Sequence, residues 1–250
     1  MDGSAAGVEQ ALLGLEAARH GLASTGYAFV RAPALRRVLL DAGLRDWDGF
    51  AASWDALGPD EYMADGGRYR SRRFAAYSVS AGAVTRKPHQ PHYQSRDYNR
   101  LNGGIARWFQ PVTDAVADHP ATLSIVRVCN GLFTSLTPAE LRPQSWHVEL
   151  HQFRIVASAE AEGRPTPEGM HRDGVDWVLV LLVRRENVAS GESRIADGAG
   201  AQLGGFTLAD PIDAALVDDR RVQHGVTAIH PLDPARPAWR DVLVLTFRYE

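Results

Sequence analysis

The spacing of hydrophobic and polar residues changes near residue 146. Before that point, apolar residues recur at helical spacing in the first third of the chain, around Val8 to Ala17 and through 33–44, and again through 111–136. Two short stretches, 26–30 and 74–80, have the composition of strands. Residues 1–145 are therefore predicted to be mainly helical with some strands.

After residue 146 the chain consists of short segments rich in β-branched and aromatic residues, separated by Gly, Pro and Asp. This spacing is typical of an antiparallel sandwich or barrel. The predicted strands are 146–156, 175–183, 193–196, 205–208, 221–229 and 241–249. No repeat and no long linker interrupts the sequence, so we expect one domain over residues 1–250, with the β-rich part at 146–250.

Composition and charge narrow the classes of function. The chain is 45% hydrophobic and 23% charged, which is typical of a globular protein, and its net charge of −3 provides no positive field for a phosphate backbone. Nucleic acid is therefore not an expected partner. The N-terminal stretch has no basic segment and carries Glu9 and Glu16, so neither a signal peptide nor a membrane-spanning helix is expected.

The single cysteine, Cys129, lies among apolar residues of a predicted helix. It cannot form an internal disulfide, and this fits a reducing, cytoplasmic environment. We interpret it as a buried thiol. The segment 87–104 has loop composition throughout, and its histidines, His89 and His92, are interpreted as exposed polar loop residues.

The candidate chemistry begins with His171 and Asp173, at the entry to a predicted apolar strand. Side chains at positions i and i+2 of an extended segment point to the same side, so the two could bind one ion. A His-x-Asp pair alone is weak evidence, because roughly 0.7 are expected by chance in a chain with this many His and Asp.

Two distant residues strengthen the case. His224 lies in a predicted strand that a folded sheet could bring beside the first pair, and two imidazoles with one carboxylate suit non-haem Fe(II), although zinc could use the same ligands. Arg240 shares one face of the last strand with Val242, Val244 and Thr246. A guanidinium on such an apolar face is costly unless it meets an anion, such as the far carboxylate of a 2-oxo acid that binds the metal. An ordinary strand-end arginine is the alternative.

Four stretches of the sequence resemble the 2-oxoglutarate/Fe(II) dioxygenases typified by bacterial L-isoleucine dioxygenase. They are His151-Gln-Phe-Arg154, Met170-His-Arg-Asp173, Gln223-His-Gly-Val-Thr227 and Trp239-Arg-Asp-Val-Leu-Val-Leu-Thr-Phe247. The resemblance implies a double-stranded β-helix (jelly-roll) core with N-terminal helices packed on it. It also implies Fe(II) bound by His171, Asp173 and His224, with 2-oxoglutarate held by Arg240.

The activity that the resemblance implies is hydroxylation of a free amino acid by O2, coupled to decarboxylation of 2-oxoglutarate to succinate and CO2. Substrate contacts are expected from Gln152 and Arg154 and from arginines among Arg68, Arg70, Arg72 and Arg73, with Trp177 narrowing the pocket or offering a stacking face. Arg154 could equally pair with Glu149 or a nearby loop, and a strand tryptophan is more commonly part of the core.

The same residues are compatible with other functions. A cupin-like dioxygenase or isomerase could use the same ligands without a 2-oxo acid, and a jelly-roll binding protein could carry the His-x-Asp pair by accident. The sequence does not specify the amino acid or the carbon that reacts. It also leaves open whether the substrate is free or carrier-tethered, and it allows either a monomer or a homodimer.

Overall fold

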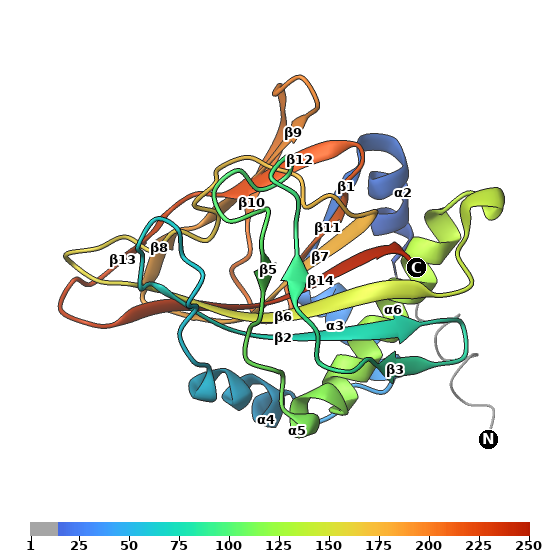
Figure 1. Cartoon of the computed structure of the whole chain (residues 1–250), viewed down its shortest axis with the longest axis horizontal. Coiled ribbons are helices and arrows are strands. Elements are labelled where there is room, and N and C mark those ends of the chain that lie inside the picture. The colour runs from blue at the N-terminus through green and yellow to red at the C-terminus, as the bar shows by residue number, and fades with distance from the viewer. Residues whose placement is uncertain (1–14) are drawn as a thin grey trace.

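A seven-stranded antiparallel sheet forms the centre of the computed structural model, which describes residues 15–250 (Figure 1). In spatial order its strands are β1 (Tyr27–Val30), β11 (Ala214–Asp218), β7 (Trp177–Glu186), β14 (Ala238–Tyr249), β6 (Trp146–Ala157), β2 (Arg70–Val79) and β3 (Val84–Arg86). Except for the consecutive strands β2 and β3, neighbours in this order are far apart in sequence, so the sheet joins the two halves of the chain.

Smaller sheets flank the central one. They contain β10 (Gln202–Thr207), β9 (Glu192–Asp197) and β12 (Val222–Val226), then β13 (Ile229–Pro231) with β8 (Val188–Ser190), and β4 (His92–Tyr93) with β5 (Ala106–Arg107). Ile195 and Val222 of the three-stranded sheet pack against β7 and β11, in one apolar cluster with Val178 of β7. The molecule therefore has two facing sheets, as the predicted jelly-roll core requires.

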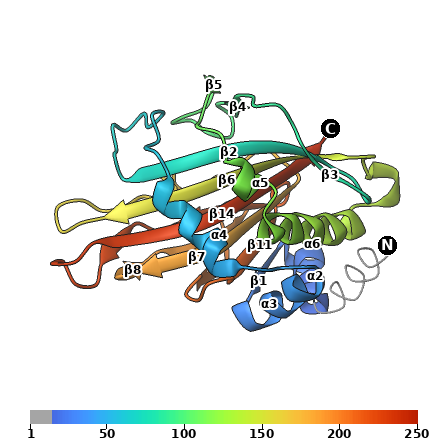
Figure 2. The ribbon, with the colours of Figure 1, turned by 90° about the horizontal axis from the view of Figure 1, so that it is seen from below.

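Helices cover the other face of the central sheet (Figure 2). They are α2 (Glu16–Thr25), α3 (Ala32–Asp41), α4 (Trp47–Ala52), α5 (Asp114–Ala117) and α6 (Pro120–Leu136), with short 3₁₀ turns η1 (Ser53–Ala56) and η2 (Ala139–Leu141). Pro33 sits in the first turn of α3, where its missing N–H costs nothing. The predicted first helix is seen only from residue 15, and its positions Val8, Leu12 and Leu13 lie outside the described residues.

The alternation of side chains along each strand determines which residues face the space between the two sheets. On β14, Leu243, Leu245 and Phe247 pack against the helices, whereas the intervening side chains face the opposite way. On β6, Val148 and Leu150 point to the helices, and the odd-numbered residues that follow Val148 point into a cavity. One face of each strand is therefore structural and the other is available for chemistry.

The predicted elements differ from the observed ones in several places, and the short strands β3, β4, β5 and β8 were not predicted. The stretch 221–229 is two strands, β12 and β13, because the chain leaves one sheet after Val226 and joins another at Ile229. The strand predicted at 74–80 begins earlier, at Arg70, and β11 was not predicted at all. The turn at 198–201 joins β9 and β10 as a hairpin, as its composition indicates.

Candidate metal centre and active-site cavity

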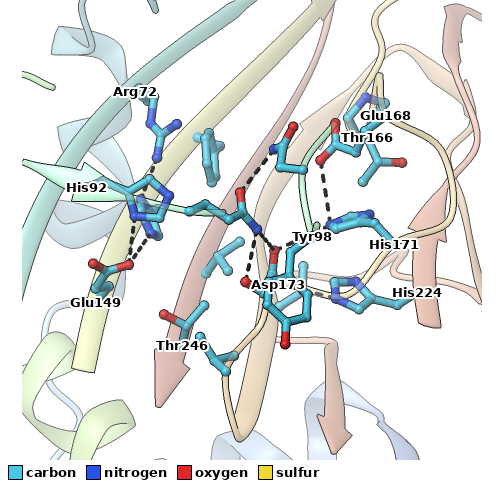
Figure 3. Close-up of a pocket in the computed structure, with 18 of the residues that line it drawn as sticks. Arg72, His92, Tyr98, Glu149, Thr166, Glu168, His171, Asp173, His224 and Thr246 are labelled. Carbon is cyan, nitrogen blue, oxygen red and sulfur yellow. Dashed lines mark hydrogen bonds and ion pairs between the residues drawn. The ribbon is translucent and has the colours of Figure 1, made fainter. Parts of the chain in front are cut away.

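A cavity of about 290 Å³ lies between the sheets (Figure 3). Its walls come from the inward faces of β6, β12 and β14, from the loop over 165–175, and from the segment that contains β4. Charged and polar groups gather at two places in it. One contains His171, Asp173 and His224, and the other contains Arg72, His92 and Glu149.

The first group brings together the three residues expected to bind a metal. Their ligand atoms all lie within 4.8 Å of one another. The backbones of His171 and His224 form an isolated antiparallel bridge, with N–H to carbonyl distances of 3.0 and 2.9 Å. This bridge fixes the two imidazoles side by side although 53 positions separate them in the sequence.

Hydrogen bonding determines which imidazole nitrogen faces the centre. His171 Nδ1 lies 3.0 Å from the carbonyl oxygen of Gly169, which can only accept, so Nδ1 carries the hydrogen. The lone pair of Nε2 then faces Asp173, 3.4 Å away. This is the arrangement in which a second partner orients a metal-binding histidine.

The electrostatics of the group favour a cation. Burial disfavours the charged imidazole of His224, but Asp173 and Asp219 outweigh it and raise its pKa to about 10. Burial likewise opposes the charged form of Asp173, yet His171 and His224 hold its pKa well below its usual range. A metal dication would take the place that a proton takes at His224.

The donor set fits a metal ion on its own geometry. His224 Nε2 is buried and has no hydrogen-bond partner among the described residues, although it lies 3.4 Å from Asp173 Oδ2. Two imidazole nitrogens and one carboxylate oxygen on one side leave the opposite side open, as in the facial triad of non-haem Fe(II) oxygenases. The described residues around the centre therefore suit Fe(II).

Asp219 is a positioning residue that sequence reasoning missed. It is 1% exposed, and its carboxylate accepts hydrogen bonds from the backbone N–H groups of Asp173 and Gly174 at 2.9 and 2.7 Å and of Val175 at 3.1 Å. It therefore fixes the loop that carries His171 and Asp173. No sequence motif around Asp219 indicates this role, because the residue follows β11, a strand that was not predicted.

Arg240 lies on the cavity face of β14, with Val242, Val244 and Thr246 as expected. It is 1% exposed, and its Nε and Nη2 have no hydrogen-bond partner within residues 15–250. Burial, and secondarily Arg185, lowers its pKa to about 10. A buried guanidinium with unpaired N–H groups is strongly unfavourable unless an anion binds it.

The second group centres on Glu149 of β6. His92 Nδ1 lies 2.8 Å from Glu149 Oε2, and His151 Nε2 lies 3.7 Å from the same oxygen. His92 is thus not the exposed loop residue that the sequence suggested, because β4 folds over the sheet and brings it to the cavity.

The second group could also hold a metal by its residue types, but its hydrogen bonds argue against this. Arg72 Nη2 lies 2.6 Å from His151 Nδ1. A guanidinium can only donate, so Nδ1 carries the lone pair and Nε2 carries the hydrogen. Burial lowers the pKa of His151 to about 3, so the ring is neutral and presents an N–H to Glu149. His151 therefore has no free lone pair to offer a metal there.

Three of the expected substrate residues lie elsewhere. Gln152 donates from Nε2 to Ser53 Oγ at 3.0 Å, and Arg154 pairs with Asp241 at 2.7 Å. Trp177 stacks on Phe133 at a centroid distance of 5.2 Å within the main core.

All three occupy the helix-side positions of β6 and β7, and none lines the cavity. The expectation placed them on the wrong face of their strands. We therefore do not propose them as substrate contacts.

Comparison with known proteins finds a matching protein family. The family model described as 2OG-Fe dioxygenase matches residues 51–246. The L-isoleucine-4-hydroxylase of Bacillus thuringiensis is 28% identical over 160 residues, which are 64% of this chain and 65% of that protein. The matched region therefore spans just under two thirds of that relative's length.

Solved structures resemble the whole fold. A bsmA homologue from Methylobium petroleophilum PM1 has a TM-score of 0.82 and 38% identity, and the match covers 93% of this chain and 92% of that one. The structure of IDO from Bacillus thuringiensis has a TM-score of 0.76 at 20% identity and covers 94% of this chain and 99% of that one. Both support the jelly-roll core with packed helices. Over the described residues, no helix is long and apolar enough to cross a bilayer.

Proposed function

The chain belongs to the 2OG-Fe dioxygenase family, and on that premise we propose that it hydroxylates a free amino acid. Members of this family use Fe(II), 2-oxoglutarate and O2. In the proposed reaction one oxygen atom enters a C–H bond of the substrate and the other enters succinate, while 2-oxoglutarate loses CO2. The proposal takes its substrate class from the relative named L-isoleucine-4-hydroxylase.

One observation carries the proposal for this chain. The group His171, Asp173 and His224 opens into the same cavity as the guanidinium of Arg240, whose Nε and Nη2 have no hydrogen-bond partner in the described part of the chain. We assign Fe(II) to the first and the far carboxylate of 2-oxoglutarate to the second. A cupin-like enzyme that does not use a 2-oxo acid would have no use for a buried cation at this position.

The protein's own side chains would position the metal ligands and shield the path to the 2-oxoglutarate site. Bound Fe(II) would supply the activation of O2 and of 2-oxoglutarate. Asp219 would hold the loop of His171 and Asp173 in register, and Gln94 Nε2, 3.2 Å from Asp173 Oδ1, would orient that carboxylate. Val242 and Val244 would line the path between the metal and Arg240 with apolar surface and exclude water from it.

The test is a turnover screen. The protein, with Fe(II), 2-oxoglutarate and O2, is incubated with each proteinogenic amino acid, and succinate and the oxygenated product are measured by mass spectrometry. We expect at least one amino acid to stimulate succinate release and to gain one oxygen atom. Asp173→Ala should abolish both signals and weaken iron binding.

Two results would contradict the proposal. One is a wild-type protein whose succinate release no amino acid stimulates. The other is an Asp173→Ala variant that retains turnover, because the reaction would then not depend on the assigned metal ligand.

A further inference from the structure

Two groups of opposite charge at the cavity each have a buried polar atom that no other atom of residues 15–250 hydrogen-bonds. Arg107 is 2% exposed, its Nε has no hydrogen-bond partner in the described chain, and its one side-chain hydrogen bond is a long contact of 3.5 Å to Gln94 Oε1. Glu168 Oε2 is likewise buried without a hydrogen-bond partner over residues 15–250. Neither group belongs to the metal triad or to the site assigned to 2-oxoglutarate.

Arg107 and Glu168 do not pair with each other. Glu168 raises the pKa of Arg107 through its charge, although burial and Arg70 lower it more strongly, so the two side chains lie within electrostatic range. Yet they form no ion pair within 4.0 Å; the carboxylate instead lies 3.6 Å from His171 Nε2. Both side chains line the same cavity without pairing with each other.

Near Arg107, the positively charged side chains outnumber the carboxylates that pair with them. Asp60 pairs with Arg70 at 2.7 Å and reaches Arg72 at 3.6 Å, so one carboxylate serves two guanidiniums. Arg72 Nε is also buried and unpartnered among the residues described. Glu149 is surrounded by imidazoles and makes no ion pair with these arginines.

We propose that this part of the cavity binds an α-amino acid as a zwitterion, with its carboxylate on Arg107 and Arg72 and its ammonium on Glu168. The inference rests on the proposed function and assigns the residues that recognise its substrate. A carboxylate matches the planar fork of a guanidinium, and a ligand that carries both charges on one carbon can satisfy both unpaired groups together. A neutral metabolite would leave both groups buried and unpaired.

The assignment also predicts a specificity. An amine that lacks the carboxylate would leave Arg107 unpaired, and an acid that lacks the ammonium would leave Glu168 unpaired. Sites built from buried polar groups reject analogues that lack the matching group much more strongly than apolar pockets reject a missing methylene.

The experiment measures binding without turnover. The protein is loaded anaerobically with Fe(II) and 2-oxoglutarate, and the melting temperature is recorded with each proteinogenic L-amino acid, then with the amine and the acid derived from the best one. We expect at least one amino acid to raise the melting temperature and both analogues to fail. Arg107→Met and Glu168→Gln should each weaken amino acid affinity by about tenfold to a hundredfold.

Several readouts separate recognition from structure. Arg107→Met removes a buried unpaired charge, so the unliganded protein should melt at the same or a higher temperature, whereas a structural arginine would lower it. Glu168→Gln is isosteric and serves if the first variant does not fold. Arg164→Met and Glu162→Gln remove the matched charges of a more exposed pair, 2.7 Å apart, and should leave amino acid affinity unchanged.

Each alternative outcome has a distinct meaning. If amino acids bind the wild type and both variants equally, the inference is wrong and the proposed function stands. If Glu168→Gln weakens iron binding instead of amino acid binding, Glu168 belongs to the metal centre and the inference is wrong. If no amino acid shifts the wild-type melting temperature, the substrate class in the proposed function is itself wrong.

Discussion

At the scale of single residues, the side chains that matter most to our account are buried, charged and unpartnered. Arg185 on β7 offers a comparison with Arg240: it is only partly buried, and it donates to the carbonyls of Leu208 and Val188 at 3.0 and 2.7 Å. Arg185 is therefore a structural arginine. Arg240 makes no such bonds within the described chain, and an anion is the simplest partner for it.

Replacement of Arg240 tests this distinction. Arg240→Met should raise the 2-oxoglutarate concentration needed for half-maximal binding by about tenfold to a hundredfold, because charge-assisted hydrogen bonds are lost. Iron affinity should be unchanged, and the melting temperature without 2-oxoglutarate should not fall. Isothermal titration with 2-oxoglutarate measures the first effect. Arg248, near the end of β14, also lines the cavity. Should Arg248→Met produce that loss and Arg240→Met leave affinity intact, Arg248 would be the anchor.

At the scale of elements, strand alternation explains both the successes and the errors of sequence reasoning. The face of β14 that carries Arg240 was predicted from a period of two and is the cavity face. The same period placed Gln152 and Arg154 together, but nothing in a single strand says which face meets the helices. The pairing of β6 with β2 and β14 fixes which face meets the helices, so the answer depends on the whole sheet and not on one strand.

The candidate metal residues were predictable for a different reason. His171 and Asp173 form a local pair whose spacing is visible in the sequence, and only His224 had to be added from a distance. Arg72, Arg107, His92 and Glu168 come from four separate segments with no shared spacing. His92 and Arg107 lie in the short strands β4 and β5, at or near the predicted loop 87–104, whereas Arg72 lies on β2 and Glu168 in the loop before His171. Only the folded chain brings the four together.

The loop of the metal pair depends on one carboxylate. Asp219→Ala should remove the acceptor for three backbone N–H groups and weaken Fe(II) affinity by about tenfold to a hundredfold, as the loss of supporting contacts around a metal site usually does. Competition with a metal chelator measures this. Asp197→Ala is the control, because Asp197 accepts from the N–H groups of Ala199 and Ala201 in the β9–β10 turn. Equal loss of iron affinity in both variants would refute the positioning role.

At the scale of the whole molecule, the central sheet separates stability from chemistry. Its helix side holds the largest apolar cluster, including Trp177, Phe133 and Phe247, whereas its other side holds the cavity. The buried Cys129 belongs to the helix side, as expected from its neighbours, and burial raises the pKa of its thiol. Substitutions on the two sides should therefore have different consequences.

Trp177 provides the test of this separation. Trp177→Ala should lower the free energy of unfolding by about 3–5 kcal/mol, because it opens a cavity beside Phe133 and removes the indole N–H bond to Thr137 at 3.3 Å. Amino acid affinity of the folded variant should stay within about threefold of wild type, since Trp177 belongs to the helix-side core and does not line the cavity. Chemical denaturation and binding titration measure the two effects. A large loss of affinity with unchanged stability would place Trp177 in the substrate site after all.

The central claim is that His171, Asp173, His224 and Arg240 together bind Fe(II) and 2-oxoglutarate. An anaerobic titration tests it most directly, since Fe(II) with 2-oxoglutarate gives a visible metal-to-ligand charge-transfer band. We predict a band that saturates at one Fe(II) per chain, disappears in Asp173→Ala, and needs more 2-oxoglutarate in Arg240→Met. A wild-type protein that binds Fe(II) but develops no band with 2-oxoglutarate would contradict the account.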